Sequence, residues 1–583
     1  MADSAAMPIA QQRGGRSGVL TVSLEDYFHA GAFGALIPRG QWYRFESRIE
    51  QGAARTLDLL DECGVSATVF VLGVVAERFP ELVRSVRERG HEVASKGYHH
   101  RPIRELSAAA LADDLARARA AIERATGERV LGCRVSGWLT PRDSWALDVM
   151  AEQGYRYDSS MRPFLRSHAD APATRRPHQH RTSAGFPIWE LPPSGVSLLG
   201  LDFPIAGGNW VRQLPPSLVR AALALGDRAS DAPLVFYFQS WELDPEQPRI
   251  DAASPLARLR HYRHLDRMPT LLRAHLAERS FTSVREWIGL SAEAASVERE
   301  PAAVRIAAPA SGPALVPMSR SLPRVPVSVV IPCYDEERAL PYLANTLRRL
   351  EDALGGAYDL RFVLVDDGST DDTPAVMRTL FGEWANVRLL RHGANRGMTA
   401  AIQTGVLAST TEIVCSMDCD CTYDPHELAR MIPHLRSGID LVVASPYHPD
   451  GAARNVSLWR RVLAKSLARL YRAVLRQPLY CYTSSFRVYR RSALLALRIR
   501  RGGFIGVTEM LARVDLAGGT IVEHPVTLDP RMFGRTRLAV VRGIADHLGL
   551  LGELAWLRLR RRGARPSISP LVPGARSLDR AAS

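Results

Sequence analysis

Short apolar runs alternate with amphipathic runs along most of the 583-residue chain. Residues 65–72 (VSATVFVL) form a strand-like run, and residues 81–89 (ELVRSVRER) repeat apolar side chains at helical spacing. Residues 327–332 (VSVVIP) open a second series of the same kind. This alternation predicts βα units, so we expect a barrel-like α/β domain in the first half and a second α/β domain after it.

A segment without hydrophobic period separates the two series. Residues 291–325 are rich in Ala, Pro, Ser and Glu and cannot bury enough apolar surface to fold alone. A chain of this length also needs more than one core. The predicted organisation is a disordered segment 1–16, a first domain 17–290, a linker 291–325, a second domain 326–562 and a loose tail 563–583.

Two acidic clusters in the second half each close an apolar run. Asp366 and Asp367 end one run (VDDGST), and Asp418 and Asp420 follow another (EIVCSM) on what reads as an extended segment. Ligands of open α/β sheets bind outside the carboxyl ends of the strands. We therefore expect Asp418 and Asp420 to hold a hard divalent cation and a diphosphate, and Asp366 and Asp367 to accept hydrogen bonds from a nucleotide base and ribose.

Five motifs of the second half follow one another in the order of a known family. They are VIPCYDEE (330–337), VDDGSTDDT (365–373), NRG (395–397), DCD (418–420) and TSSFR (483–487). Over about residues 325–542 the chain resembles inverting GT-A glycosyltransferases of family 2, in the branch of dolichol-phosphate mannose synthase. The resemblance implies a Rossmann-like GT-A domain that transfers a sugar from a nucleotide sugar with inversion.

Site residues follow from the matched motifs as three groups. The resemblance implies that the nucleotide sugar is held by Pro332, Tyr334, Glu336, Asp366, Asp367, Asn395, Arg396, Gly397 and Asp418. Asp418 and Asp420 are the implied ligands of Mg or Mn. An acceptor phosphate would meet Arg487, Arg531 and Arg537. Arg537 lies in residues 530–537 (PRMFGRTR), which depart from the family's Pro-Arg-x-x-Gly-x-Ser-Lys at Thr536 and Arg537, but an arginine still suits phosphate.

The acceptor decides whether the reaction needs a base. A phosphate acceptor is already ionised at neutral pH, whereas an alcohol needs a general base. Glu509 and Asp529 are the candidates, and the alternative is that either one only orients a basic neighbour. Polyprenyl phosphate, a lipid and a glycan all remain open as acceptors.

The net charge of +14 does not indicate nucleic-acid binding, because the arginines are spread over both halves without an aromatic-basic platform. The odd number of cysteines and the absence of an apolar signal segment predict a reducing, cytoplasmic setting. A soft-metal site of Cys415, Cys419 and Cys421 is not expected, since no fourth ligand accompanies them.

The chain has no uninterrupted apolar stretch of spanning length, and its best candidate, residues 538–559, is broken by Arg542, Asp546, His547 and Glu553. Residues 556–562 (WLRLRRR) follow an amphipathic run. We interpret them as a peripheral contact with the anionic inner face of a membrane, with a solvated basic helix end as the alternative.

The first half contains motifs of a second family. LTVSLEDYF (20–28), HEVASKGYHH (91–100), YDSS (157–160) and FYFQSWELD (236–244) resemble polysaccharide deacetylases over roughly residues 17–288. The resemblance implies a deformed (β/α) barrel. It also implies an Asp base, an Asp-His-His zinc site and a histidine acid that together remove an acetyl group.

Three of these places are changed. Ser23 replaces the base, Lys96 replaces a metal histidine and Gln239 replaces the acid, while Asp26 and His100 remain. A hydroxyl is no base near pH 7, an amide donates no proton to a leaving amine, and an ammonium repels a divalent cation. We expect no zinc, no deacetylation and a Lys96–Asp26 ion pair. A shifted metal site from Glu25, Asp26, His99 and His100 is the alternative.

A barrel without catalytic activity would serve as a glycan-binding or scaffolding module. Its candidate sugar contacts are Arg134, Trp138, Trp241 and Glu242, and the alternative is that these are core and rim residues of the fold. The favoured function is therefore a metal-dependent inverting glycosyltransferase with such a module. A bifunctional deacetylase-transferase of surface polysaccharide synthesis is one alternative. A non-catalytic glycan-binding scaffold is another, although the intact Asp418 and Asp420 argue against it.

Overall fold

The computed structural model describes residues 17–34, 36–161, 176–198, 201–204, 206–229, 232–290, 323–454, 456–534 and 540–563. The chain divides into two compact units at Val316 and Pro317. The predicted segments 1–16 and most of 291–325 and 563–583 lie outside the described residues. The second domain begins with a strand at Val325, one residue before its predicted start.

The first unit is built on a nine-stranded sheet in the order β10-β1-β2-β3-β4-β5-β7-β6, with β11 beside β1. Only β6 and β7 pair in antiparallel fashion among these strands. The strands are β1 (Ser17–Leu24), β2 (Thr68–Val71), β3 (Glu92–Ser95), β4 (Gly132–Cys133), β5 (Tyr157–Asp158), β6 (His178–Arg181), β7 (Pro187–Glu190), β10 (Leu234–Gln239) and β11 (Ser280–Thr282). A separate hairpin contains β8 (Gly195–Leu198) and β9 (Leu201–Pro204).

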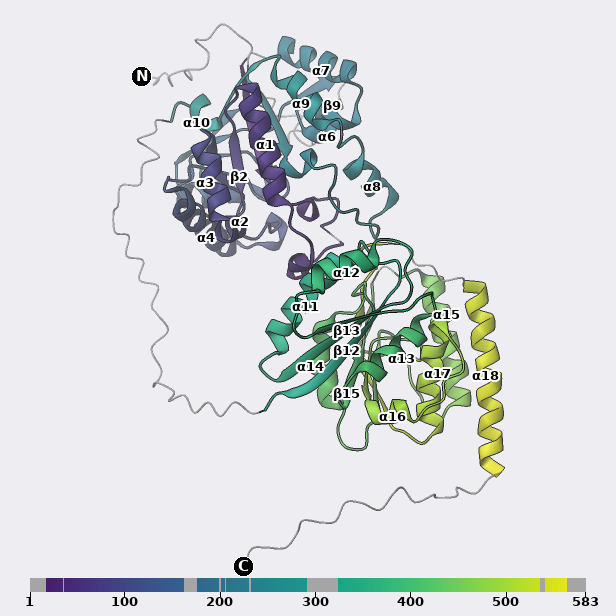
Figure 1. Ribbon diagram of the computed structural model, residues 1–583. Helices are drawn as coiled ribbons and strands as arrows, with labels where there is room; N and C mark the ends of the chain where they lie inside the picture. Colours follow the sequence, from purple (N-terminus) through teal and green to yellow (C-terminus); the bar gives the residue numbers. More distant parts are fainter. Residues whose placement is uncertain are drawn as a thin grey trace, which may run out of the picture. The chain divides into compact units, whose positions relative to one another are not determined.

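Helices with one apolar face cover this sheet (Figure 1). They are α1 (Ile49–Cys63), α2 (Gly73–Arg78), α3 (Pro80–Glu88), α4 (Ala108–Thr126), α5 (Trp145–Glu152), α6 (Gly208–Gln213), α7 (Pro216–Ala229), α8 (Pro255–Tyr262), α9 (Met268–Leu276) and α10 (Val284–Trp287). Local sequence sets their ends. For α4, the Ser107 hydroxyl accepts a hydrogen bond from the Ala110 N–H at the start, and Gly127 at φ 71° ends the helix.

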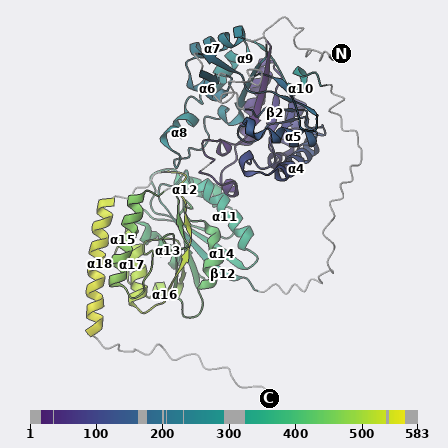
Figure 2. The ribbon, with the colours of Figure 1, turned by 180° about the vertical axis from the view of Figure 1, so that it is seen from behind.

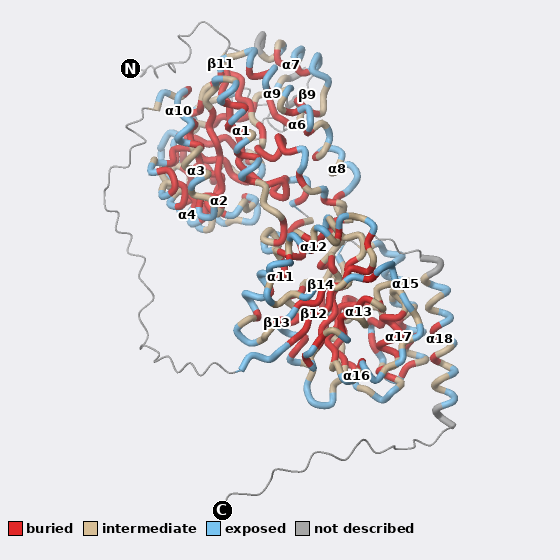
Figure 3. The backbone as a smooth tube through the Cα atoms, in the orientation of Figure 1, coloured by how far each residue is buried: buried red, intermediate tan, exposed pale blue. Residues whose placement is uncertain are grey.

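The second unit has a seven-stranded sheet in the order β14-β13-β12-β15-β18-β16-β19. Its strands are β12 (Val325–Cys333), β13 (Tyr358–Asp366), β14 (Val387–Arg391), β15 (Ile413–Ser416), β16 (Leu441–Ser445), β18 (Arg487–Arg490) and β19 (Ile521–Pro525). The helices are α11 (Leu340–Leu354), α12 (Thr373–Phe381), α13 (Met398–Ala408), α14 (Leu428–Met431), α15 (Leu458–Val474), α16 (Arg491–Leu495), α17 (Gly503–Leu516) and α18 (Val540–Gly563). Figure 3 shows that β12 and its neighbours form the buried centre of this unit.

One excursion interrupts the parallel order of the second sheet. After β16 the chain forms β17 (Ala452–Ala453) and α15, and it returns as β18, which lies antiparallel between β15 and β16. A short strand β20 (Thr527–Leu528) pairs with β17. Helix α18 packs on α15 and α17, and Figure 2 shows it along the edge of the unit.

The predicted fold class is confirmed in both halves. The strand expected over 65–72 is shorter, β2, and the helix expected over 81–89 is α3. The prediction of an extended segment at Asp418 and Asp420 was wrong. After β15 the chain enters a turn in which the Cys421 N–H donates to the Asp418 carbonyl, and Cys421 has φ 51°.

Candidate functional site

The carboxyl ends of three neighbouring strands carry the acidic residues of the second unit. β12 ends shortly before Glu336, β13 ends at Asp366, and β15 ends two residues before Asp418. Since β12 pairs with β13 and β15 in parallel, these ends lie at one edge of the sheet. The structure thus places both acidic clusters at one edge of the sheet, and their roles stay predictions.

An arginine joins the acidic residues at this edge. The Arg531 guanidinium forms an ion pair with Glu336, and its Nη1 lies 3.5 Å from Asp420 Oδ2. Burial, opposed by Arg531 and reinforced by Asp420, raises the pKa of Glu336 to about 7. Burial and the neighbouring Asp420 also raise the pKa of Asp418 to about 7. The site therefore contains more partly buried carboxyl groups than one arginine can pair with.

Ser485 orients Asp418, and the sequence interpretation missed this role. The Ser485 hydroxyl lies 2.7 Å from both Asp418 carboxylate oxygens, and it precedes β18 by two residues. The Ser485 carbonyl accepts a hydrogen bond from the Ser416 hydroxyl at the end of β15. The TSSFR motif contained this serine, but nothing in the sequence indicated that β18 pairs beside β15.

The carboxylates at this edge fit a hard divalent cation. Carboxylate oxygens are the ligands that Mg and Mn prefer, and such ions commonly take one or two protein carboxylates together with substrate phosphates. Within the described ranges, no group of three His, Cys, Asp or Glu side chains is arranged to hold a metal alone. Asp418 and Asp420 would thus hold a cation together with the diphosphate of a donor.

Asp366 and Asp367 are both buried and are bound by protein groups. Asp367 accepts hydrogen bonds from the Arg396 N–H at 2.9 Å and the Gly397 N–H at 2.7 Å, and its Oδ1 lies 2.6 Å from His392 Nδ1. Asp366 accepts from the Ser369 N–H and lies 3.0 Å from Arg391 Nε. In this structure Asp367 holds the NRG loop through these hydrogen bonds. The expected contacts of Asp366 and Asp367 with a base and ribose stay a prediction.

The NRG loop leads into α13. Gly397 has φ 89°, a left-handed conformation, and a Cβ on it would lie 2.6 Å from the Gly503 nitrogen. Asn395 and Arg396 are exposed, so their side chains are open to a ligand, whereas the Arg396 N–H is already bound to Asp367. Pro332 and Tyr334 lie partly buried at and just after the end of β12.

Arg487 and Glu509 are placed differently from their predicted roles. Arg487 is fully buried and donates to the Tyr482 and Val507 carbonyls at 2.9 and 2.7 Å. Glu509 is also fully buried on α17 and accepts from the Arg500 and Arg501 N–H groups and from Arg513 Nε at 2.6 Å. These placements argue against an acceptor-phosphate ligand and a general base, because neither side chain has surface to meet a substrate.

Asp529 remains near the acidic edge. Its N–H donates to the Thr422 carbonyl at 2.8 Å, two residues after Asp420, and its Oδ1 lies 3.4 Å from Arg454 Nη1. The side chain is 14% exposed, so it is accessible where Glu509 is not. Arg537 lies outside the described residues, and its predicted role stays a prediction.

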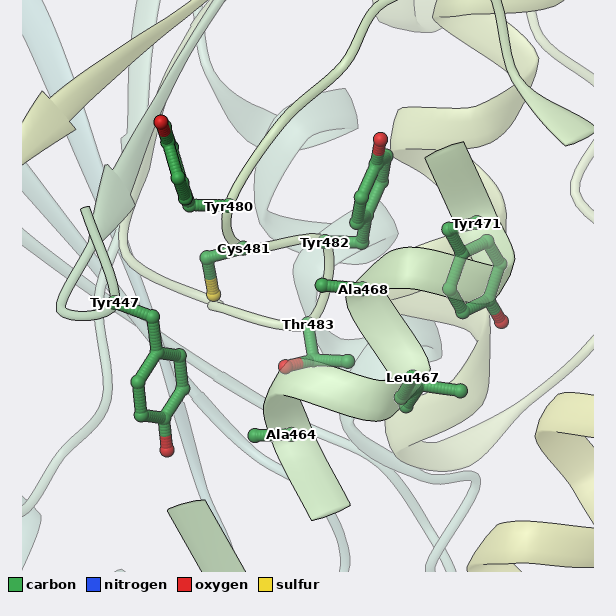
Figure 4. Close-up of a pocket in the computed structure, with 9 residues that line it drawn as sticks. All are labelled: Tyr447, Ala464, Leu467, Ala468, Tyr471, Tyr480, Cys481, Tyr482 and Thr483. Carbon is green, nitrogen blue, oxygen red and sulfur yellow. The ribbon is translucent and has the colours of Figure 1, made fainter. Parts of the chain in front are cut away.

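A narrow pocket lies between α15 and residues 480–483. Figure 4 shows its lining, which includes Tyr447, Tyr471, Tyr480 and Tyr482. Its volume of about 10 Å³ leaves room for one water molecule. Thr483, which lines the pocket, is two residues from Ser485 in the sequence. The pocket is too small to bind an acceptor without a change of shape.

The changed residues of the first unit also lie at strand ends. Ser23 in β1 is the register partner of Gln239 in β10, and Lys96 follows β3 directly. Lys96 donates to the Ser23 hydroxyl at 3.0 Å, and its ion pair is with Glu25. The expected Lys96–Asp26 pair was wrong, because Asp26 accepts hydrogen bonds from the Ser47 hydroxyl and the Arg48 N–H instead.

Family models match both halves. A model for glycosyl transferase family 2 matches residues 328–498. A model for polysaccharide deacetylases matches residues 42–157, and a domain of unknown function (DUF3473) matches residues 159–289.

Similar proteins each cover part of the chain. The polyprenol monophosphomannose synthase of Mycolicibacterium smegmatis is 28% identical over 219 residues, which are 36% of this chain and 80% of that protein. An uncharacterized glycosyltransferase of Mycobacterium tuberculosis is 33% identical over 227 residues, 36% of this chain and 89% of that protein. A solved complex of glucosyl-3-phosphoglycerate synthase from M. tuberculosis with Mn²⁺, UDP and glucosyl-3-phosphoglycerate is 21% identical, with a TM-score of 0.29 and coverage of 42% of this chain and 82% of that one.

Proposed function

The chain belongs to glycosyl transferase family 2, and from this premise we propose that its second unit transfers a sugar, with inversion, from a nucleotide sugar to a polyprenyl phosphate or related lipid acceptor. The observation that carries the proposal is the gathering of Glu336, Asp418, Asp420 and Arg531 at one sheet edge. The acceptor class is supported by the name of the mycobacterial polyprenol monophosphomannose synthase.

Each residue of the edge has a task in this proposal. A divalent Mg or Mn ion, when bound, neutralises charge on the departing diphosphate. Asp418, oriented by Ser485, and Asp420 would bind that ion. The exposed Arg396 side chain of the NRG loop would meet phosphate, while the Arg396 and Gly397 N–H groups stay bound to Asp367. Arg531, which pairs with Glu336 and Asp420 in the free protein, becomes available to a phosphate once those carboxylates have another cation.

No strong base is needed for a phosphate acceptor, whose attacking oxygen is already ionised. A single in-line attack then inverts the anomeric carbon. Asp529 is the candidate base for an alcohol acceptor, because it is accessible and its N–H donates to the Thr422 carbonyl beside the acidic turn.

An exposed apolar and basic surface supports a lipid acceptor. On α15 the side chains of Leu458, Trp459, Val462 and Leu470 are 73, 52, 56 and 47% exposed. The helix also carries five arginines and lysines and no acidic residue. Each basic side chain near an anionic bilayer contributes about 1 kcal/mol, and the apolar side chains insert between headgroups.

Helix α18 extends this surface. It packs on α15, and Trp556 and Leu559 are 51 and 67% exposed, with Arg560 stacked over the Trp556 ring. No helix among the described residues has the length and hydropathy to cross a bilayer. We propose peripheral attachment to the inner face of a membrane through α15 and the predicted segment 556–562.

Transfer assays with purified protein test the reaction. UDP-, GDP- and dTDP-sugars are offered with Mg or Mn and a polyprenyl phosphate, beside Asp420→Asn and the matched control Asp352→Asn, whose carboxylate is exposed on α11. We expect transfer that is lost with EDTA and in Asp420→Asn but kept in Asp352→Asn. Equal activity of Asp420→Asn, or no turnover with any donor, would reject the proposal.

Vesicle sedimentation tests the surface separately. Val462→Asp is expected to reduce binding to phosphatidylglycerol vesicles, whereas Thr379→Asp, which adds the same charge on α12, is not. Equal loss in both variants would show that only net charge matters. Binding that neither variant changes would show that α15 does not contact the bilayer.

A further inference from the structure

A buried lysine occupies the centre of the strand-end site in the first unit. Lys96 and Glu25 are 6 and 2% exposed, and their side chains form an ion pair. Glu25 Oε1 also lies 3.2 Å from His100 Nε2, and Lys96 Nζ lies 3.0 Å from the Ser23 hydroxyl. The ammonium group thus contacts a carboxylate and a hydroxyl, and the carboxylate also contacts an imidazole; these are kinds of group that a divalent cation would use.

We infer that the Lys96 ammonium is a permanently attached cation that takes the place of a metal ion in this site and excludes one. The zinc chemistry that the deacetylase resemblance implies therefore does not fit the residues present. This inference concerns the first unit alone and does not rest on the proposed transferase function.

The charges support the assignment. Burial alone would raise the pKa of Glu25, but Lys96 and His100 hold it well below its usual range, so the carboxylate stays ionised. Burial lowers the pKa of Lys96, and the Glu25 carboxylate opposes that effect. A divalent ion at the same place would face the ammonium at contact distance, and the lysine cannot diffuse away.

The other candidate ligands are engaged elsewhere. Both Asp26 oxygens accept hydrogen bonds, from Ser47 and from the Arg48 N–H, and His29 Nδ1 accepts from the Asp26 N–H. Burial lowers the pKa of His29 to about 3, which keeps its ring neutral. Of the alternative set Glu25, Asp26, His99 and His100, the first and last lie 3.2 Å apart, and among the described residues no three His, Cys, Asp or Glu side chains are arranged to hold a metal.

The first test removes the internal cation from the full chain. In Lys96→Met the buried Glu25 loses its counter-charge, and we expect the melting temperature of the first unit to fall by roughly 10 °C. The double variant Lys96→Met with Glu25→Gln is expected to regain most of this loss, because both charges are then absent. Equal melting of Lys96→Met and wild type, or no recovery in the double variant, would contradict the inference.

The second test asks whether the place accepts a metal once the ammonium is gone. Lys96→His puts a second imidazole beside Glu25 and His100, and Co²⁺ then reports tetrahedral binding by its visible absorption. All proteins carry Asp420→Asn, so that the second unit's carboxylates do not contribute.

We expect one Co²⁺ per chain and a raised melting temperature in Lys96→His, and neither effect in the parent with Lys96. The further change His100→Ala is expected to abolish the signal. Co²⁺ uptake by the parent would show that the lysine excludes nothing. Absence of uptake in a folded Lys96→His protein would show that the lysine does not occupy a cation position.

Discussion

A single buried carboxylate, Asp367, connects three strand and helix ends of the second unit. Its oxygens accept hydrogen bonds from the Arg396 and Gly397 N–H groups and contact His392 at the end of β14. The loop in front of α13 therefore depends on one side chain for its position.

In Asp367→Asn one of these N–H groups loses its acceptor. Hydrogen bonds to charged groups contribute about 1.5–3 kcal/mol, so we expect kcat/KM for the nucleotide sugar to fall at least about 10-fold, mainly through KM. The control is Asp371→Asn, which lies with Asp367 in the loop between β13 and α12. A change confined to kcat would mean that Asp367 acts on the reacting groups and not on the loop.

The carboxyl group of Asp26 makes the stability of the first unit depend on pH. Burial raises its pKa to about 6, partly offset by the hydrogen bonds of Ser47 and the Arg48 N–H. Between about pH 4 and pH 6 the folded protein holds a proton that the unfolded chain has lost, so unfolding free energy falls as pH rises, by up to about 3 kcal/mol.

Asp26→Asn keeps the side-chain shape and removes the charge. We expect it to raise the melting temperature of the first unit at pH 8 and to have a smaller effect at pH 5, measured against the exposed control Asp58→Asn. A gain of equal size at both pH values would show that the buried charge is not the cause.

These residues also show what sequence reasoning can reach. The motifs placed Glu336, Asp418, Asp420 and Arg531 in one site, and the structure brings them together, although their roles stay predictions. The prediction that Lys96 pairs with Asp26 was wrong, because neighbouring residues beyond a strand end point in different directions, and Glu25 is the one that meets Lys96. Arg487 was matched by motif, but a motif carries no information on burial.

At the scale of elements, α13 and α17 approach each other closely through a glycine. A Cβ on Gly506 would lie 2.2 Å from the Arg501 carbonyl oxygen and 2.4 Å from Thr399 Oγ1. Thr399 in turn donates to the Gly503 carbonyl at 2.5 Å. The start of α13, which carries the NRG loop, is thereby fixed against α17.

We expect Gly506→Ala to lower the free energy of unfolding of the second unit by about 1–3 kcal/mol and to raise KM for the donor. Gly552→Ala on α18 is the matched control, because a Cβ there meets nothing within 4 Å. Denaturant unfolding of both variants measures the difference. Equal stability of the two variants would show that α13 and α17 can separate without cost.

The elements that sequence periodicity predicted best are those with local signals, such as α3 and β12. The antiparallel insertion of β18 was not predicted, since pairing with β15 and β16 is decided by residues far apart in the chain. Ser485 acquired its contact with Asp418 only through that insertion.

At the scale of the whole molecule, each unit has its own core. The first unit buries residues around Leu20, Val69 and Phe236, and the second buries residues around Val330, Val414 and Leu511. Independent cores predict independent folding.

We expect residues 17–290 and 323–563, produced separately, each to unfold cooperatively near the temperature of the corresponding transition in the full chain. Calorimetry of the three proteins makes the comparison. Sugar transfer is expected from the second fragment alone. Failure of either fragment to fold, with the full chain intact, would show that the units depend on each other.

The excursion between β16 and β18 has a consequence for how such an enzyme can diversify. Both ends of this segment are fixed in the sheet, and α15 with its exposed apolar side chains lies between them. The strand ends of β12 and β13, which we propose bind the donor, belong to a different part of the chain. Changes in the part of the excursion that contains α15 can therefore change which acceptor receives the sugar, provided that Ser485, at the end of the excursion, keeps its contact with Asp418.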